Sequence, residues 1–359
     1  KKILKKAAQK KKKEKYSKMT NKEKILVTGG AGFIGSNFIR YLLKNDPKVN
    51  LINYDALTYA GNLENISDLL NNKRHIFIKG DIRDKLALET LFKENNISGV
   101  INFAAESHVD RSLENPEDFI STNIIGTINL LQNAKKYGIN RFLQISTDEV
   151  YGSLTEDAPP FTENSPIQPN SPYSASKAAA DHFVRAYNHS YGLNTIITRC
   201  SNNYGPYQFP EKMIPLCINN AFNNKKIPVY GDGMQIRDWL YVEDHCEAIW
   251  LAFKEGKTGE IYNIGGNCQI RNIELVKIIL RECGKDESLI SFVKDRPGHD
   301  KRYAMDFSKI KNELGWSPKY NFDEAIKKTI KWYSEHKNWL NNLVSGAYME
   351  YYEKMYKNR

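Results

Sequence analysis

The sequence has no apolar run close to the roughly 18 residues that a membrane-spanning helix needs. No apolar segment follows the N-terminal lysines either, so we expect neither a membrane partner nor a secretory signal peptide. Cysteine is scarce, and the five residues Cys200, Cys217, Cys246, Cys268 and Cys283 include no Cys-x-x-Cys pair. This number and spacing indicate reduced thiols in a cytoplasmic protein, and they indicate neither a disulfide framework nor a metal site.

The excess of positive charge is confined to one end of the chain. The formal net charge is +10, and residues 1 to 24 alone hold 12 lysines against two acidic residues. The remaining 335 residues carry 40 basic and 40 acidic side chains. We therefore expect residues 1–23 to be a basic, disordered tail, for which weak contact with an anionic surface is the alternative. A neutral body gives no indication of nucleic-acid binding.

Short apolar segments typical of strands alternate along the chain with segments of helical period. Such alternation arises when each strand of a parallel sheet returns through a helix on one face. The pattern predicts an α/β fold with a doubly wound, Rossmann-type parallel sheet. The expected strands are Lys24–Thr28, Asn50–Tyr54, His75–Lys79, Gly99–Phe103, Asn140–Ser146 and Leu193–Arg199, and the expected helices are Phe33–Asn45, Asp84–Asn95, Pro116–Tyr137 and Tyr173–Tyr191.

The pattern changes after Asn202, where glycine and proline become frequent and helices and strands are scattered among loops. This change predicts a smaller α+β lobe. We expect the Rossmann domain to cover residues 24–201 and residues 237–265 to return to it. The smaller lobe would then comprise 202–236 and 266–345, with a closing helix over Phe322–Leu340 and a C-terminal tail over 346–359.

A glycine-rich turn lies between the first expected strand and the first expected helix. Gly29, Gly32 and Gly35 have the spacing Gly-x-x-Gly-x-x-Gly. Small residues there allow a tight turn and a close approach of the backbone to a pyrophosphate, which the helix N-terminus attracts. A purely structural turn is the alternative, because a glycine loop alone is a weak signal.

Asp55 strengthens the prediction of a dinucleotide site. It ends the second expected strand, 20 residues beyond Gly35, where a carboxylate can accept hydrogen bonds from both ribose hydroxyls. The carboxylate would repel a 2′-phosphate, and Ala56 and Leu57 supply no cation to bind one. The segment therefore favours NAD over NADP, with an ordinary surface aspartate as the alternative.

Two further strand ends complete the predicted cofactor site. Asp81 and Ile82 follow the third expected strand, where adenine would be contacted. Phe103–Ser107 ends the fourth, beside the crevice that forms at the carboxyl ends of parallel strands.

Tyr173 and Lys177 are four residues apart, so on a helix their side chains lie on one face. A nearby ammonium group lowers the pKa of a phenol, and we expect this to let Tyr173 take a proton from a sugar hydroxyl. Lys177 could also hold ribose hydroxyls of the cofactor. An unrelated pair on a solvated helix is the alternative.

Thr147, Asp148 and Glu149 follow the expected strand Asn140–Ser146. Because neighbouring strand residues point to opposite faces, both carboxyl groups can enter one crevice only if the strand has already ended. Two carboxyl groups in one pocket do not ionise equally, so one would act as a general acid and the other as a general base. Solvation or capping of the strand end is the alternative.

Together these motifs resemble the extended short-chain dehydrogenase/reductase family and, more closely, its nucleotide-sugar 4,6-dehydratases of the dTDP-glucose type. The resemblance extends from about residue 24 to residue 340. The segments that carry it are Gly29–Gly35, Asp55–Asn62, Ala104–Asp110, Ser146–Gly152, Tyr173–Lys177, Arg199–Pro206, Arg237–Trp239 and Asp295–Asp300.

The resemblance implies dehydration of a nucleoside-diphosphate glucose in three steps. Tyr173 would remove the 4-hydroxyl proton while hydride leaves carbon 4 for NAD⁺, with Thr147 bonded to the 4-oxygen. Glu149 would then take the proton from carbon 5 while Asp148 protonates the departing 6-hydroxyl. Hydride return to carbon 6 would give the 4-keto-6-deoxy sugar. Related 4-epimerases usually have small, uncharged residues in place of Asp148 and Glu149.

The second lobe would hold the nucleoside diphosphate. Arg237 and Arg296 suit this task because a guanidinium binds phosphate oxygens in a bidentate manner, although Arg237 could instead form a surface ion pair with Asp238. By resemblance, the substrate would also contact Ser107, His108, Asn202, Lys212, Met213, Pro228, Tyr230, Asn272 and His299, and NAD would also contact Phe33, Ile34, Thr58, Ala104, Ala105, Thr122 and Asn203.

Two questions stay open at this point. The residues do not separate dTDP-glucose from UDP-glucose, since plant-like UDP-glucose 4,6-dehydratases share the Thr-Asp-Glu run, and an NAD-dependent 4-epimerase is a further alternative. The resemblance also implies a homodimer formed through helices such as Pro116–Tyr137 and Tyr173–Tyr191.

Overall fold

The computed structural model of the chain describes residues 24–295, 297–344 and 352. The expected tail over residues 1–23, nearly all of the expected tail over 346–359, and Arg296 lie outside the described residues. No helix among the described residues is long and apolar enough to cross a membrane.

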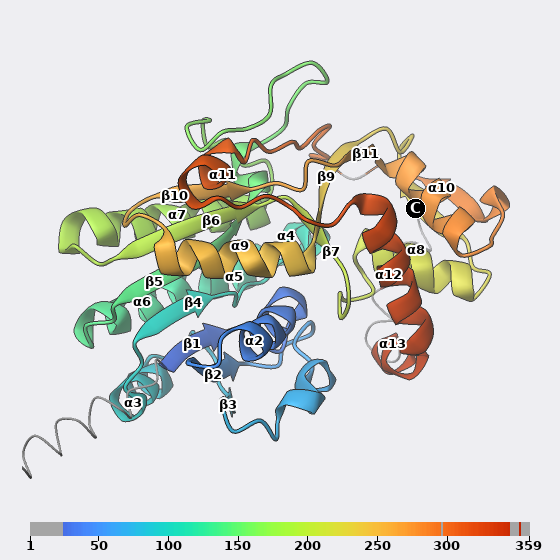
Figure 1. Ribbon diagram of the computed structural model, residues 1–359. Helices are drawn as coiled ribbons and strands as arrows, with labels where there is room; N and C mark the ends of the chain where they lie inside the picture. Colours follow the sequence, from blue (N-terminus) through green and yellow to red (C-terminus); the bar gives the residue numbers. More distant parts are fainter. Residues whose placement is uncertain (1–23, 296, 345–351, 353–359) are drawn as a thin grey trace, which may run out of the picture.

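A seven-stranded sheet, parallel throughout, forms the centre of the molecule (Figure 1). The predicted doubly wound sheet is thereby confirmed, and the strand order reverses direction between β1 and β4, as it does in such sheets. In sheet order the strands are β10 (Ile261–Ile264), β6 (Thr195–Cys200), β5 (Arg141–Thr147), β4 (Gly99–Asn102), β1 (Lys24–Thr28), β2 (Asn50–Asp55) and β3 (His75–Lys79).

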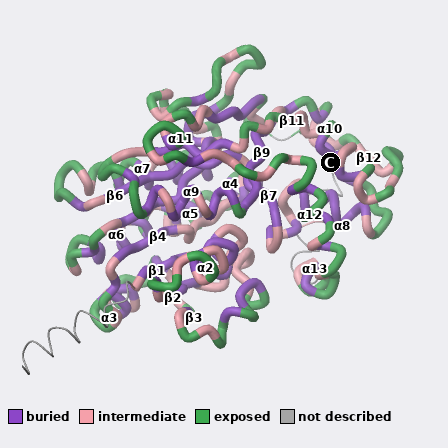
Figure 2. The backbone as a smooth tube through the Cα atoms, in the orientation of Figure 1, coloured by how far each residue is buried: buried purple, intermediate pink, exposed green. Residues whose placement is uncertain are grey.

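Helices cover both faces of this sheet because the strands are apolar on both sides (Figures 1 and 2). One hydrophobic cluster joins the sheet to α2 (Phe33–Asn45), α9 (Val242–Glu255) and α11 (Ser308–Leu314). A second cluster on the other face joins it to α3 (Lys85–Asn95), α6 (Thr127–Lys136) and α7 (Pro172–Tyr191).

The helix α7 has strong signals at both ends. At its start, Ser171 and Ser174 form a capping box and Pro172 occupies the first turn. At its end, Gly192 has a φ of +66°, the left-handed conformation that a glycine adopts without strain. These signals fix where Tyr173 and Lys177 lie along the helix.

The helix that we expected over Pro116–Tyr137 is interrupted. The structure has a short α5 (Pro116–Phe119), a π-helical segment η2 (Ile120–Gly126) and then α6. Within η2, the Asn123 side chain accepts a hydrogen bond from the backbone N–H of Glu106 and donates one to the carbonyl of Glu106. This attachment to the loop after β4 accompanies the widened turn, and π-helical turns are frequent beside functional sites.

The second lobe is built on two small sheets. β7 (Asn202–Tyr204), β9 (Ile236–Tyr241) and β11 (Gln269–Arg271) form one, and β8 (Ile227–Tyr230) pairs with β12 (Ile290–Val293) in the other. A separate hydrophobic cluster packs these strands against their helices. The helices of this cluster are α8 (Met213–Phe222), α10 (Asn272–Glu282), α12 (Phe322–Glu335) and α13 (Lys337–Leu343), the last two replacing the single helix expected over Phe322–Leu340.

The segment expected to return to the Rossmann domain is shared between the lobes. β9 belongs to a sheet of the second lobe, whereas α9 packs against the central sheet and β10 joins its edge beside β6. The remaining elements are α4 (Val109–Glu114), η1 (Leu63–Leu69), η3 (Asp148–Tyr151) and η4 (Glu287–Leu289). The predicted boundaries of the two domains stay a prediction.

Candidate active site

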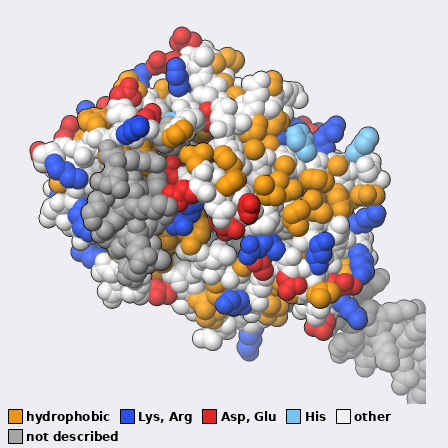
Figure 3. All heavy atoms as spheres, turned by 180° about the vertical axis from the view of Figure 1, so that it is seen from behind, with side chains coloured by type: hydrophobic (Ala, Val, Ile, Leu, Met, Phe, Trp, Pro, Cys, Tyr) orange, Lys and Arg blue, Asp and Glu red, His pale blue; other side chains and the backbone are white. Residues whose placement is uncertain are grey.

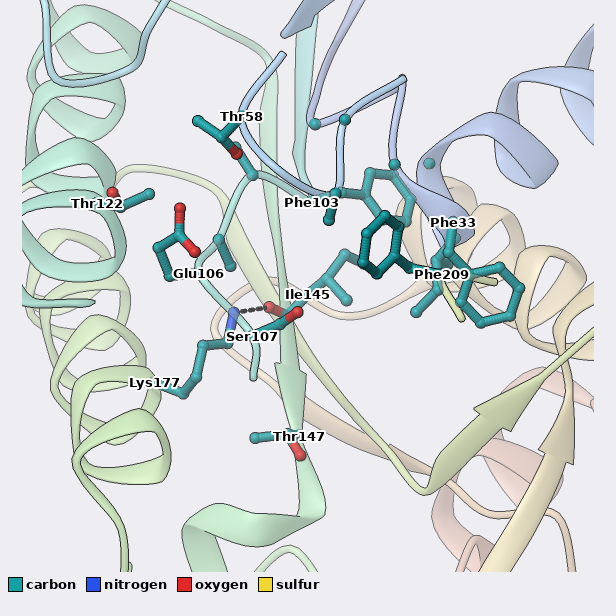
Figure 4. Close-up of a pocket in the computed structure, with 18 of the residues that line it drawn as sticks. Phe33, Thr58, Phe103, Glu106, Ser107, Thr122, Ile145, Thr147, Lys177 and Phe209 are labelled. Carbon is teal, nitrogen blue, oxygen red and sulfur yellow. Dashed lines mark hydrogen bonds between the residues drawn. The ribbon is translucent and has the colours of Figure 1, made fainter. Parts of the chain in front are cut away.

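A cavity of about 290 Å³ lies at the carboxyl ends of the parallel strands (Figure 4). Each of the strands β1 to β6 contributes the residues at or just after its end, so six separate segments of the chain meet there. The cavity extends to the second lobe, because residues after β7 also line it. This is the position at which doubly wound sheets bind their ligands.

The glycine-rich turn packs against the first residues of the loop that follows β4, and the contact leaves no space for a side chain on the turn. Gly29 has a φ of +69°, and a Cβ atom there would lie 2.6 Å from the backbone nitrogen of Ala104. A Cβ atom on Gly35 would lie 2.3 Å from the carbonyl oxygen of Gly29. The turn therefore requires glycine at both positions and leaves the N-terminus of α2 open to the cavity.

The Asp55 carboxylate lies at the end of β2 and is buried. It accepts hydrogen bonds from the backbone N–H of Ala31 at 2.9 Å and of Leu57 at 2.8 Å. Burial raises the pKa of Asp55 although these two hydrogen bonds lower it. Asp55 thus fixes the glycine-rich turn as well as lining the cavity.

Asp81 lies just after the end of β3, on the cavity wall, and it forms an ion pair with Arg83. Arg83 donates to both carboxylate oxygens, with its Nε 2.9 Å from Oδ2 and its backbone N–H 2.8 Å from Oδ1. Burial alone would raise the pKa of Asp81, but the hydrogen bonds from Arg83 outweigh it and the pKa is lowered. Arg83 lines the cavity and was not among the residues predicted from the sequence.

The strand β5 ends at Thr147, and Asp148 begins the 3₁₀ turn η3. The Thr147 hydroxyl caps this turn by accepting from the backbone N–H of Glu149 at 3.3 Å. The change from strand to turn removes the alternation of faces, so Asp148 and Glu149 both line the cavity. This is the geometry that the sequence required of an acid–base pair.

Asp148 is 1% exposed, and its Oδ2 atom has no hydrogen-bond partner among the described residues. Burial raises the pKa of Asp148 well above its usual range, and the negative charges of Glu149 and Asp238 raise it further. The positive charge of Arg237 and the hydroxyl of Thr147 act in the opposite direction. The pKa of Asp148 is therefore shifted toward that of a proton donor, with Glu149 beside it on the cavity wall.

Tyr173 and Lys177 line the cavity from the first turns of α7, but the lysine does not act on the phenol as expected. Lys177 Nζ donates to the carbonyl oxygen of Ile145 at 2.6 Å, as Figure 4 shows. Burial raises the pKa of Tyr173 well above its usual range, and Glu149 raises it further, whereas the hydroxyl of Thr147 lowers it. The expected lowering of the Tyr173 pKa is thus wrong for the protein alone, because desolvation outweighs every favourable contact.

Most of the predicted cofactor residues surround this one cavity. Leu57 is the exception: its backbone N–H contacts Asp55, but its side chain does not line the cavity. Those that do line it are Gly29, Gly32, Phe33, Ile34, Gly35, Asp55, Ala56, Thr58, Asp81, Ile82, Phe103, Ala104, Ala105, Ser107, Thr122, Tyr173, Lys177 and Asn203.

The predicted substrate residues divide into two groups. Ser107, Asn202 and Lys212 line the cavity together with the Thr147–Glu149 segment, and Lys212 Nζ donates to the carbonyl oxygen of Ser107 at 2.8 Å. The structure does not place the others on the cavity wall, and Arg296 lies outside the described residues. Those beyond the wall are His108, Met213, Pro228, Tyr230, Arg237, Asn272 and His299.

Several residues of the second group lie near one another in the second lobe. The rings of Tyr230 and His299 are 6.1 Å apart, and His299 Nδ1 lies 2.6 Å from the carboxylate of Asp295. Gln235 also donates to Asp295, and Asn272 N–H donates to the carbonyl of Gln235. Arg237 is the link to the cavity, since its charge acts on Asp148.

Sequence reasoning missed one group of cavity residues. The guanidinium of Arg111 lies 4.0 Å from the centre of the Tyr59 ring and 3.2 Å from the carboxylate of Glu211, while Phe209 meets Tyr59 edge-on. Tyr59, Phe209 and Glu211 line the cavity together with Glu106. These contacts join segments far apart in the sequence. Tyr59 and Glu106 lie in motifs that carry the family resemblance, whereas Arg111, Phe209 and Glu211 lie in none, so the sequence offered no signal for these three.

No group of three or more metal-ligating side chains that could hold a metal ion occurs among the described residues. All five cysteines, each of them a described residue, are free thiols.

A family model described as GDP-mannose 4,6 dehydratase matches residues 26–329. The chain belongs to this family. Named relatives are more specific than the family model. A dTDP-glucose 4,6-dehydratase of Xanthomonas campestris pv. campestris (strain B100) is 52% identical over 341 residues, which cover 90% of this chain and 96% of that protein. One of Neisseria meningitidis serogroup B (strain ATCC BAA-335 / MC58) is 51% identical, with coverage of 90% and 97%.

Solved structures of family members agree. DesIV, a dTDP-glucose 4,6-dehydratase from Streptomyces venezuelae with NAD and TYD bound, has a TM-score of 0.87 and 47% identity, over 89% of this chain and 99% of that one. A UDP-glucose 4-epimerase from Thermotoga maritima with UDP-glucose has a TM-score of 0.81 and 31% identity, over 87% and 99%. The fold is therefore shared with epimerases, whereas the higher identity is to dehydratases.

The raised pKa of Asp148 predicts a specific dependence of stability on pH. The folded protein holds the Asp148 proton above the ordinary value of 3.8, where the unfolded chain releases it. Between that value and the raised pKa the wild type should lose stability as pH rises, by at most about 1.4 kcal/mol per pH unit from this group. Asp148→Asn should lack this loss, so its stability advantage should grow with pH.

Urea unfolding of both proteins between about pH 4 and pH 7 measures this difference. Asp157→Asn, at an exposed aspartate, is the control and should show no growing advantage. An advantage of Asp148→Asn that stays constant over this pH range would contradict a raised pKa of the buried Asp148.

Proposed function

We propose that the protein is an NAD-dependent dTDP-glucose 4,6-dehydratase that forms the 4-keto-6-deoxy sugar nucleotide. One observation carries the proposal: the acid–base pair Asp148 and Glu149 lines the same cavity as Tyr173 and Lys177. The first pair suits removal of water and the second suits oxidation of an alcohol. A binding protein without catalysis gives no reason for this combination.

The cavity fits a dinucleotide. The turn at Gly29 and Gly35 is a cradle that a Cβ atom would fill, and Asp55 lies where a ribose would be bound. Gly32, Phe33 and Ile34 would hold the pyrophosphate at the start of α2, with Lys177 on the second ribose. NAD⁺, when bound there, would supply the acceptor and later donor of hydride, together with a positive charge.

In the first half of the reaction Tyr173 would accept the proton of the 4-hydroxyl group. The hydroxyl of Thr147, which already acts on the Tyr173 phenol, would donate to the developing carbonyl oxygen at carbon 4. Lys177, fixed beside β5 by its bond to the Ile145 carbonyl, would contribute a positive charge that favours an ionised phenol once substrate and NAD⁺ occupy the cavity.

In the second half the new ketone acidifies the proton on carbon 5, which Glu149 would remove. Asp148, whose pKa burial raises, would donate its proton to the 6-hydroxyl so that it leaves as water. A carboxylic acid with an ordinary pKa would have no proton to give at neutral pH. The raised pKa of Asp148 therefore supports elimination over 4-epimerisation, which needs no such acid.

The dTDP nucleotide is favoured over UDP because the relatives with about half of their residues identical are named for dTDP-glucose. Arg237 and the cluster around Tyr230 and His299 would bind the nucleoside diphosphate from the second lobe.

We further propose that the protein acts as a homodimer in the cytoplasm. Exposed apolar side chains support the dimer: Leu113 on α4, Ile120 and Ile125 on η2, and Phe183 on α7 come from elements that contact one another. Figure 3 shows hydrophobic side chains gathered on the face of the molecule seen from behind. Free thiols at all five cysteines accord with a reducing compartment.

Turnover of dTDP-glucose with added NAD⁺ tests the proposed activity, with UDP-glucose compared at the same concentrations. We expect the 4-keto-6-deoxy product, detected by its absorbance after alkaline treatment, and a higher kcat/KM for dTDP-glucose. Formation of a 4-epimer without the keto product would overturn the dehydratase in favour of an epimerase. A higher kcat/KM for UDP-glucose would overturn the nucleotide assignment alone.

Tyr173→Phe removes only the phenolic hydroxyl and should lower kcat by about 10²- to 10⁴-fold, the usual contribution of a general base. Because oxidation is the first step, a single turnover should show no transient NADH absorbance. Tyr191→Phe, at an exposed tyrosine at the end of the same helix, is the matched control and should turn over normally. Normal turnover of Tyr173→Phe would reject the base assignment.

The double variant Asp148→Asn, Glu149→Gln should separate the two halves of the reaction. Tyr173 and Lys177 are untouched, so oxidation should proceed and NADH absorbance should accumulate with bound substrate. Elimination lacks both its acid and its base, so release of the keto product should fall by at least about 10²-fold. Full product formation would show that other groups perform the elimination.

A further inference from the structure

Behind the reacting residues lies a buried ion pair that has no part in the proposed chemistry. Arg199 on β6 donates from Nε to Oδ2 of Asp181 on α7 at 2.9 Å, and both side chains are almost fully buried. An ion pair in such a place loses its hydration on both sides, so burial often cancels the attraction. Stability alone is therefore a weak explanation for it.

The position of Asp181 relates it to the two reacting residues of α7. Tyr173, Lys177 and Asp181 follow one another at intervals of four residues, so their side chains lie along one face of the helix. Both Lys177 and Asp181 on that face form hydrogen bonds to β5. Asp181 is the next side chain below Lys177, on the side away from the cavity, and it does not line the cavity wall.

Two consecutive residues of β5 bind this face of α7. The carbonyl oxygen of Ile145 accepts from Lys177 Nζ at 2.6 Å, and the hydroxyl of Ser146 donates to Asp181 Oδ2 at 3.0 Å. Thr147 follows directly and begins the acid–base segment. Lys177 and Asp181 are thus attached to the strand immediately before the reacting groups.

Arg199 holds the Asp181 carboxylate from the neighbouring strand. In the β5–β6 register Arg199 lies opposite Ser146, which brings both donors to the same oxygen atom. The guanidinium of Arg199 lies 4.8 Å from the centre of the Tyr151 ring, and the Tyr151 hydroxyl donates to Asn263 Oδ1 at 2.8 Å. Oδ1 of Asp181 has no hydrogen-bond partner among the described residues. Two hydrogen bonds to Oδ2 therefore fix the carboxylate in place, while Oδ1 accepts none.

We propose that Asp181, fixed by Arg199 and Ser146, is a positioning residue that keeps the Lys177 ammonium charged and attached to β5 for the chemistry of Tyr173. The inference rests on the proposed function, in which a charged Lys177 favours ionisation of the phenol. In this role the Asp181–Arg199 ion pair affects the charge of Lys177, which a purely structural contact would not do.

The charges around Lys177 support this role of Asp181. Burial lowers the pKa of Lys177, and the Asp181 carboxylate is the first charge that raises it, followed by the Cys200 thiol on β6. Arg199, paired with Asp181, brings a positive charge to the same side. Tyr173, Asp148 and Glu149 line the cavity wall with Lys177, and burial raises the pKa of Tyr173 and of Asp148. Without Asp181 the buried ammonium would lose its main compensating charge.

Asp181→Asn tests the inference because asparagine keeps the shape and the acceptor atom but not the charge. The alkaline limb of the kcat/KM profile, measured with saturating NAD⁺, should move to lower pH by about one unit, since Lys177 loses its proton earlier. Acetylation of Lys177 by acetic anhydride, followed against pH by peptide mass spectrometry, should show its midpoint shifted in the same direction. An unchanged limb and an unchanged acetylation midpoint would overturn the proposal, even if activity or stability fell.

Two further variants complete the experiment. Asp181→Asn leaves Arg199 as a buried charge without its ion-pair partner. The double variant Asp181→Asn, Arg199→Gln removes both charges, and the alkaline limb should move in the same direction. Asp244→Asn removes an equally buried carboxylate from α9, where it accepts from the backbone N–H groups of Lys319 and Tyr320, and it should leave the limb unmoved. If the wild type turns over no sugar nucleotide, the proposed function fails, and the acetylation midpoints still decide the role of Asp181.

Discussion

The structure of the site depends on the end of strand β5 at Thr147. While the strand continues, its side chains alternate between the two helical layers, and Ser146 accordingly points toward Asp181 on α7. At Thr147 the backbone turns into η3, and the threonine hydroxyl satisfies an N–H group that the strand no longer pairs. From this residue onward Asp148 and Glu149 enter the cavity together. A longer strand would place one of the two carboxyl groups in a helical layer.

Desolvation then decides what each group can do. Asp148, Tyr173 and Lys177 are all nearly inaccessible to water, and each is held in its neutral form more strongly than in solution. For Asp148 this state is useful, because a proton donor must keep its proton until the leaving group needs it. For Tyr173 and Lys177 desolvation is unfavourable, because both are proposed to act in their charged forms. Opposite charges placed nearby have to offset this effect of burial. The buried Asp181–Arg199 pair belongs to this second class of contacts.

Most of the central sheet and much of the cofactor site could be predicted because their signals are local. Alternating apolar segments identify parallel strands, parallel strands bring their carboxyl ends to one edge, and so Gly29, Asp55, Asp81 and Phe103 meet although they are far apart in the chain. The π-helical segment η2 had no such signal, since its widened turn accompanies the attachment of Asn123 to the loop after β4. The cluster of Arg111 with Glu211 could not be predicted either, because it joins α4 to the loop before α8, 100 residues further along the chain.

The sign of the Tyr173 shift shows the limit of reasoning from residue spacing. The interval of four residues correctly places Tyr173 and Lys177 on the wall of one cavity, but spacing carries no information on how deeply both are buried. The second lobe adds a similar complication at Asp148. Arg237 and Asp238 are neighbours on β9 with opposite effects on the Asp148 pKa, and Asp238 is itself held by the backbone N–H groups of Gly266 and Cys268. The pKa of Asp148, in the Rossmann domain, therefore depends in part on charges carried by β9 of the second lobe.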